Sequence, residues 1–172
     1  MKTEAELGHV DYRWFSRIQV EHDSLDRVFN SLSSTLTLMA TPSASPQDPD
    51  LLADVRDDLS FALDEMLEHF GAEEEAIFSQ IRAHLPSLKQ AADQLERDHE
   101  VLCQKTSQLR KMVSAARAGD GDLDLKTALQ IIGETTELLA RHNQQEVQLF
   151  FEAFERFDTE QRAHLVKTLQ NH

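Results

Sequence analysis

Four long stretches of the chain carry a hydrophobic residue at every third or fourth position, which is the repeat that keeps one face of an α-helix against its neighbours. We expect these helices at about residues 11–40, 49–84, 86–118 and 122–157, with short connections between them. No segment shows the alternating pattern of a β-strand. The spacing therefore predicts an all-α fold, an antiparallel up-down-up-down four-helix bundle.

The expected helix ends coincide with local start and stop signals. The first connection, TPSASPQDPD, is rich in proline and serine, and its Asp48 and Pro49 form a favourable N-cap and first-turn pair. Asp158, with Gln161 three residues later, resembles a capping box. This second signal predicts a short C-terminal helix at about 158–170.

Every predicted helix has a histidine where its stripe calls for a hydrophobic residue, and two helices add a glutamate one turn later. In antiparallel helices, residues that are equally far from the connecting turn lie at the same level of the bundle. Measured from turns near the middle of each connection, the paired positions differ by one or two residues, which is about 1.5–3 Å along the axis. We therefore expect one layer to contain all six polar side chains: His22, His69, Glu73, His99, His142 and Glu146.

These residue types indicate a metal site. His-x-x-x-Glu places both side chains on one face of a helix, with Cβ atoms about 5–6 Å apart. Four imidazoles and two carboxylates exceed the four ligands of an ordinary structural zinc ion, but they fit two cations that are bridged by both glutamates. The mixture of nitrogen and oxygen favours iron, with manganese or zinc as substitutes, over calcium or magnesium. The alternative is a set of ordinary core histidines, yet burying unpaired carboxylates would be costly.

The two His-x-x-x-Glu motifs occur in HFGAEEEAIF and RHNQQEVQLFF, and the segment DHEVL contains His99. Together with His22, these segments resemble the hemerythrin-like (HHE cation-binding) domain, and the resemblance covers roughly residues 9–157. It implies an oxo- or hydroxo-bridged pair of iron ions, with the four histidines as terminal ligands and with Glu73 and Glu146 as bridges.

The ligand pattern differs from that of oxygen-carrying hemerythrins. Their third helix carries His-x-x-x-His, whereas here His99 is followed four residues later by Cys103. Their fourth helix has an aspartate five residues after its histidine, whereas here Glu146 follows His142 after four. Two glutamates with four histidines look more like the di-iron domain of iron-centre repair proteins, which act under nitrosative stress.

The ligand count leaves a coordination position on each iron for O2, NO or peroxide. The sequence thus favours a non-haem di-iron protein that binds one of these molecules for sensing, storage, or defence against oxidative or nitrosative stress. Whether it turns over as an enzyme stays open. Two alternatives remain. One is an iron donor or reservoir that serves an acceptor protein in the repair of iron centres, and the other is a helical interaction module in which the metal only staples the fold.

Composition limits the partners and the location of the chain. A length of 172 residues suits a single domain over residues 1–172, with its bundle at about 9–157. The net charge of −14 argues against nucleic acid and anionic membranes as partners. One cysteine excludes an internal disulfide. We expect neither a secretory signal nor a membrane-spanning helix, because the first twenty residues carry charges throughout and no apolar run is long enough. We expect a cytoplasmic protein, monomeric or homodimeric.

Several other side chains can each be interpreted in two ways. Cys103 could face the metal layer as a redox-active thiol or extra ligand, or it could be a small buried hydrophobic residue. Glu65 and Glu96, one turn before two of the histidines, could accept their ring N–H bonds or simply be surface charges. The phenylalanines of LFFEAFERF could dock the C-terminal helix or form a dimer contact. We expect the remaining histidines to be exposed: His9, His84, His164 and His172.

Overall fold

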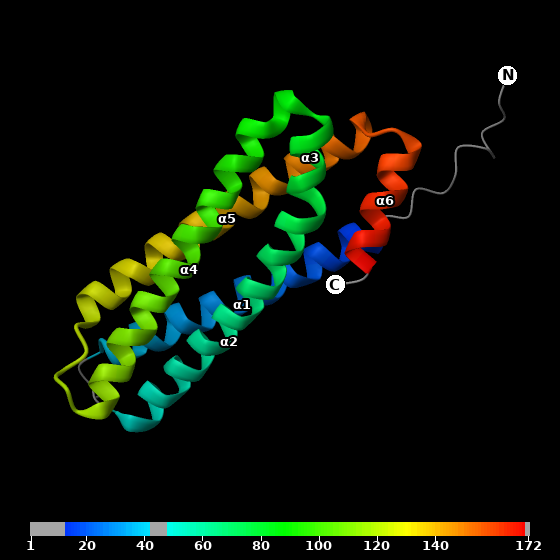
Figure 1. Ribbon diagram of the computed structural model, residues 1–172. Coiled ribbons are helices and arrows are strands. Elements are labelled where there is room, and N and C mark those ends of the chain that lie inside the picture. The colour runs from blue at the N-terminus through cyan, green and yellow to red at the C-terminus, as the bar shows by residue number, and fades with distance from the viewer. Residues whose placement is uncertain (1–12, 42–47, 171–172) are drawn as a thin grey trace, which may run out of the picture.

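The long helices of the chain lie side by side in a bundle (Figure 1). A computed structural model describes residues 13–41 and 48–170, and all of its regular elements are helical, as predicted. The two helices α1 and α4 each pack against both α2 and α5. The bounds of these four are Arg13–Met39 for α1, Pro49–Glu73 for α2, Lys89–Ala118 for α4 and Leu125–Arg156 for α5. Among the described helices, none is long and apolar enough to cross a membrane.

The second predicted helix has the expected extent but is not uniformly α-helical. After α2, the chain makes one π-helical turn, η2 (Glu74–Phe78), and then continues as α3 (Ser79–His84). A short 3-10 turn, η3 (Pro86–Leu88), leads into α4. The hydrophobic spacing contained no sign of the π-helical turn that the structure places directly after Glu73.

The predicted caps are confirmed. The side chain of Asp48 accepts hydrogen bonds from the backbone N–H groups of Asp50 and Leu51 at 3.0 and 3.3 Å, and Pro49 occupies the first turn of α2. The side chain of Asp158 accepts from the N–H of Gln161 at 2.9 Å. The Gln161 side chain accepts in return from the N–H of Asp158 at 3.1 Å, which completes the capping box of α6 (Thr159–Gln170).

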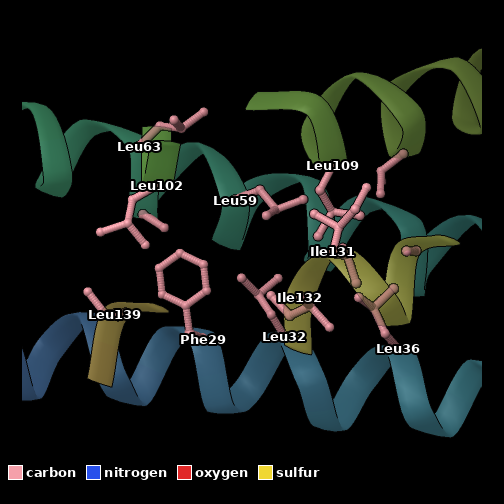
Figure 2. Close-up of a cluster of buried hydrophobic side chains, with 14 of the residues drawn as sticks. Phe29, Leu32, Leu36, Leu59, Leu63, Leu102, Leu109, Ile131, Ile132 and Leu139 are labelled. Carbon is pink, nitrogen blue, oxygen red and sulfur yellow. The ribbon is translucent and has the colours of Figure 1, made fainter. Parts of the chain in front are cut away.

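Two hydrophobic clusters fill the bundle, one on each side of the predicted polar layer. The larger cluster includes the side chains that Figure 2 labels, among them Phe29 of α1, Leu59 of α2, Leu109 of α4 and Ile132 of α5. The other cluster lies at the end that α6 covers. On α1, for example, Leu25 belongs to the first cluster and Ile18 to the second, with His22 between them.

The phenylalanines at the end of α5 and directly after it pack against α6, which is the first of the two interpretations of the segment LFFEAFERF. Phe150, Phe154 and Phe157 are buried in the second cluster together with Leu165 and Leu169 of α6. The helix α6 therefore covers the apolar side chains at this end of the bundle.

Candidate metal centre

The structure brings all six predicted side chains together in the interior of the bundle. One comes from α1, two from α2, one from α4 and two from α5, and each is at most 4% exposed. The prediction that these six side chains lie at one level of the bundle is therefore confirmed. The six residues are His22, His69, Glu73, His99, His142 and Glu146. Their assignment as metal ligands stays a prediction.

The six side chains form two adjoining groups. In the first, Nε2 of His69 lies 3.2 Å from Oε1 of Glu73, and Nε2 of His22 lies 3.0 Å from Oε2 of Glu146. In the second, the Nε2 atoms of His99 and His142 lie 3.2 Å apart. Within each group, the atoms that could bind a cation all lie within 4.8 Å of one another.

The two glutamates connect these groups. Oε1 of Glu73 faces His69, whereas its Oε2 lies 3.7 Å from Nε2 of His99. Oε2 of Glu146 faces His22, whereas its Oε1 lies 3.5 Å from Nε2 of His142. Each carboxylate therefore presents one oxygen to each group, which is the arrangement of a carboxylate that bridges two cations.

A test of fit comes from the buried polar atoms. Both oxygens of Glu73, both oxygens of Glu146, and Nε2 of His22 and His69 have no hydrogen-bond partner in the described part of the chain. Nitrogen and oxygen atoms of these side chains lie close together, but their contacts do not have the geometry of hydrogen bonds. Leaving so many polar atoms unsatisfied is costly in a protein interior, and cations would satisfy them. Neutral imidazoles with carboxylates form a donor set that suits transition metals.

The pKa values of the two buried glutamates are shifted in opposite directions. Burial, and then the negative charge of Glu146, raise the pKa of Glu73 well above its usual value. Burial also acts to raise the pKa of Glu146, but the imidazoles of His142, His22 and His99 outweigh it and lower that pKa well below the usual value. Because a metal ligand must be deprotonated, we expect cation binding to release the proton of Glu73.

Two further glutamates hold the outer nitrogens of the histidine rings. Nδ1 of His69 donates to Oε2 of Glu21 at 2.8 Å, and Nδ1 of His99 donates to Oε1 of Glu74 at 2.7 Å. Burial lowers the pKa of His69, although its hydrogen bond to Glu21 acts in the other direction. The balance favours the neutral imidazole that metal binding requires.

Neither of the two glutamates for which the sequence left this role open, Glu65 and Glu96, has it. Glu96 forms an ion pair with Arg82 instead of bonding His99, and Glu21 rather than Glu65 is the partner of His69. Of the two readings, surface charge is the correct one for Glu96. One signal could have found the true partners: Glu21 directly precedes one predicted ligand in the sequence, and Glu74 directly follows another.

Cys103 does not join either group of potential ligands among the described residues. Its half-buried side chain packs against the larger hydrophobic cluster and lines an open surface groove of about 720 Å³ with Leu63 and Leu67. Burial, and then the charge of Glu74, raise the pKa of its thiol. This environment supports the reading of Cys103 as a small hydrophobic residue.

Of the four remaining histidines, His84 and His164 are exposed, as expected. His9 and His172 lie outside the described residues.

The sequence of the chain matches a known family. Residues 15–169 match the family model of the hemerythrin HHE cation binding domain, and this range contains all six clustered side chains and all of α6 except its last residue. No match was found among curated proteins or among solved structures. The family match implies binding of a metal cation, and the two histidine and glutamate groups supply suitable ligands. Since the match spans most of its length, this chain belongs to the hemerythrin HHE cation-binding family.

Proposed function

We propose that the chain holds two iron ions, bridged by Glu73 and Glu146, and that this centre binds O2, NO or peroxide. The observation that carries the proposal is the orientation of the two glutamates, each of which presents one partnerless oxygen to each histidine pair. Two cations would satisfy all four oxygens at once, whereas one cation would leave part of the cluster unpaired.

The number and type of donors support iron and an open coordination position. The first group contains two imidazoles and both carboxylates, and the second contains two imidazoles and Glu146. Oε2 of Glu73, 3.7 Å from Nε2 of His99, would add a fourth protein donor to the second group. Iron commonly accepts more ligands than four, so small molecules could occupy the remaining positions. When bound, an iron pair supplies open coordination positions and electrons for exchange with a small oxidant.

The surroundings of the cluster restrict what could reach it. All six side chains are nearly inaccessible to solvent, and apolar clusters lie on both sides of them along the bundle axis. A ligand of more than a few atoms would have to displace packed side chains. The burial therefore supports a diatomic molecule or peroxide as the ligand, rather than a larger substrate.

The proposal can be tested with protein produced in iron-rich medium. We expect about two irons per chain, and new visible absorption bands when the reduced protein meets O2, NO or peroxide. The double variant Glu73→Ala, Glu146→Ala should lose the iron, and Glu68→Ala, an exposed position on the same helix as Glu73, should retain it. Full iron content in the double variant would overturn the bridging role of the glutamates.

The same samples separate the proposal from its two alternatives. Rapid loss of iron to an apo-protein acceptor, without a response to the small oxidants, would support an iron donor or reservoir. Spectra that stay unchanged with all three molecules, together with retained iron, would leave a metal that only stabilises the fold.

A further inference from the structure

The imidazole of His99 is enclosed by one side chain of α2 and two side chains of the π-helical turn η2. The ring of Phe70 stacks on it, with centroids 3.8 Å apart and planes inclined by 5°. The ring of Phe78 lies at 5.6 Å and 20°. Oε1 of Glu74 accepts the hydrogen bond from Nδ1 at 2.7 Å. We call Phe70, Glu74 and Phe78 the His99 clamp.

The π-helical turn η2 forms part of this clamp. Its first residue is Glu74 and its last is Phe78, and the turn follows directly after Glu73. Glu73 is buried within the cluster, while its sequence neighbour Glu74 remains partly exposed at the outer nitrogen of His99. Single π-helical turns occur frequently at functional sites. Here, the turn allows two successive glutamates to contact the same histidine from different sides.

We propose that the His99 clamp fixes the ring plane and the tautomer of His99, and that Glu74 is a positioning residue for the cation held by His99 and His142. A carboxylate can only accept a hydrogen bond, so Nδ1 of His99 carries the proton. The lone pair of Nε2 then points into the cluster, toward Oε2 of Glu73 and Oε1 of Glu146, each at 3.7 Å. This inference rests on the proposed function, since it assigns a role toward the bound metal.

His142, the other histidine that would hold this cation, has no carboxylate at its outer nitrogen in the described part of the chain. Nδ1 of His142 is buried and has no hydrogen-bond partner among the described residues. The other group has one supported histidine as well, because Glu21 accepts from His69 and is itself held by Arg17 at 2.7 Å. Each group of ligands therefore contains at least one imidazole with a fixed orientation, and in the His99 group this orientation depends on Glu74.

The first experiment uses metal-free protein, so that it does not depend on the identity of the cation. Nitrogen-15 NMR of the histidine rings should show His99 of the native protein with its proton on Nδ1. Glu74→Met keeps the length of the side chain but removes the acceptor, so a mixture of tautomers is expected. Glu74→Gln keeps an acceptor oxygen and should restore the native tautomer. The exposed Glu68→Ala serves as the control.

The second experiment titrates ferrous iron into the same variants under anaerobic conditions. We expect Glu74→Met to weaken one of two binding events by about 10–100-fold, which is the usual effect of removing such a partner. Glu74→Gln should weaken it less, and Glu68→Ala should not change it. If Glu74→Met does not fold, as judged by circular dichroism, Glu74→Ala replaces it with the same expectation.

Two results would overturn the inference: a native tautomer of His99 without the Glu74 acceptor, or unchanged affinity for both irons in that variant. A failure of the proposed function looks different. In that case the native protein would not bind two irons, while the NMR spectra of the metal-free variants would still show whether the clamp fixes the His99 ring.

Discussion

Glu21 accepts a hydrogen bond from Nδ1 of His69 at 2.8 Å, across the interface between α1 and α2. Glu21 is also the residue before His22, one of the clustered histidines. A similar relationship occurs at the start of η2, where Glu74 follows Glu73 in the sequence and accepts a hydrogen bond from Nδ1 of His99 in α4. In both cases, the residue next to a clustered side chain in the sequence accepts a hydrogen bond from a clustered histidine of a neighbouring helix.

The first prediction concerns Glu21. Glu21→Ala should weaken iron binding by about 10–100-fold, because the imidazole of His69 loses the group that fixes its orientation. Glu21→Gln should restore part of the affinity. The measurement is competition for ferrous iron with a chelator of known affinity. Glu65→Ala is the matched control, since Glu65 lies one turn before His69 but is not the partner of its ring. Equal losses in Glu65→Ala and Glu21→Ala would refute a specific role for Glu21.

The sequence predicted the layer of six side chains because the layer depends only on helical spacing and chain length between turns. The stripe on α2, for instance, leads from Met66 to His69 and Glu73, and all three are buried as expected. The partners Glu21 and Glu74 depend instead on how far a side chain reaches across a helix interface, which spacing along one helix does not specify.

Local competition explains the remaining differences. Glu96 lies one turn before His99, but Arg82 of α3 approaches it from the neighbouring helix and forms an ion pair with it.

The π-helical turn at Glu74–Phe78 could not be predicted from the sequence either. Its sequence, EEAIF, has no proline or glycine that would mark an irregular helix.

The second prediction concerns the effect of pH on the metal-free protein. Because the pKa of Glu73 is raised in the folded state, the folded protein holds this proton over a range where the unfolded chain has lost it. The contribution of Glu73 to stability is therefore fully present below the ordinary glutamate pKa of about 4.3 and is lost as the pH rises toward the raised value.

Thermal unfolding across this range, in native protein and in Glu73→Gln, should isolate that contribution. The difference in melting temperature between the two should change in favour of the variant as the pH rises, because glutamine has no proton to lose. Titrating groups that lie away from Glu73 are present in both proteins and cancel in the comparison. A difference that stays constant from pH 4 to pH 8 would contradict the raised pKa of Glu73.

The third prediction concerns the start of α2. Asp48→Ala removes the acceptor for the backbone N–H groups of Asp50 and Leu51, and should lower the free energy of unfolding by about 1 kcal/mol. Urea titration of the metal-free protein measures this change. Asp64→Ala, an exposed position within the same helix, should leave the stability nearly unchanged. A loss of similar size in Asp64→Ala would point to a general effect of charge instead of capping.

The fourth prediction concerns the larger hydrophobic cluster. Phe29 is completely buried and lies beside Leu32 and Leu139 (Figure 2). Phe29→Ala should lower the free energy of unfolding by about 3–5 kcal/mol, because it removes a buried ring and leaves a cavity. Phe61 is 47% exposed, so Phe61→Ala provides the matched control and should cost much less. Similar losses in the two variants would indicate that the region around Phe29 collapses into the space left by the ring.

The fifth prediction concerns Cys103, which occupies the position four residues after His99. Its thiol lies outside both ligand groups of the described residues, so Cys103→Ala should bind the same amount of iron as the native protein. Burial and the charge of Glu74 raise the pKa of the thiol, which reduces the fraction of reactive thiolate at neutral pH. Iodoacetamide should therefore modify Cys103 more slowly than a free cysteine at pH 8. Glu74→Gln removes the nearby charge and should shift the rate profile toward lower pH. Loss of iron in Cys103→Ala would instead support the thiol as an additional ligand.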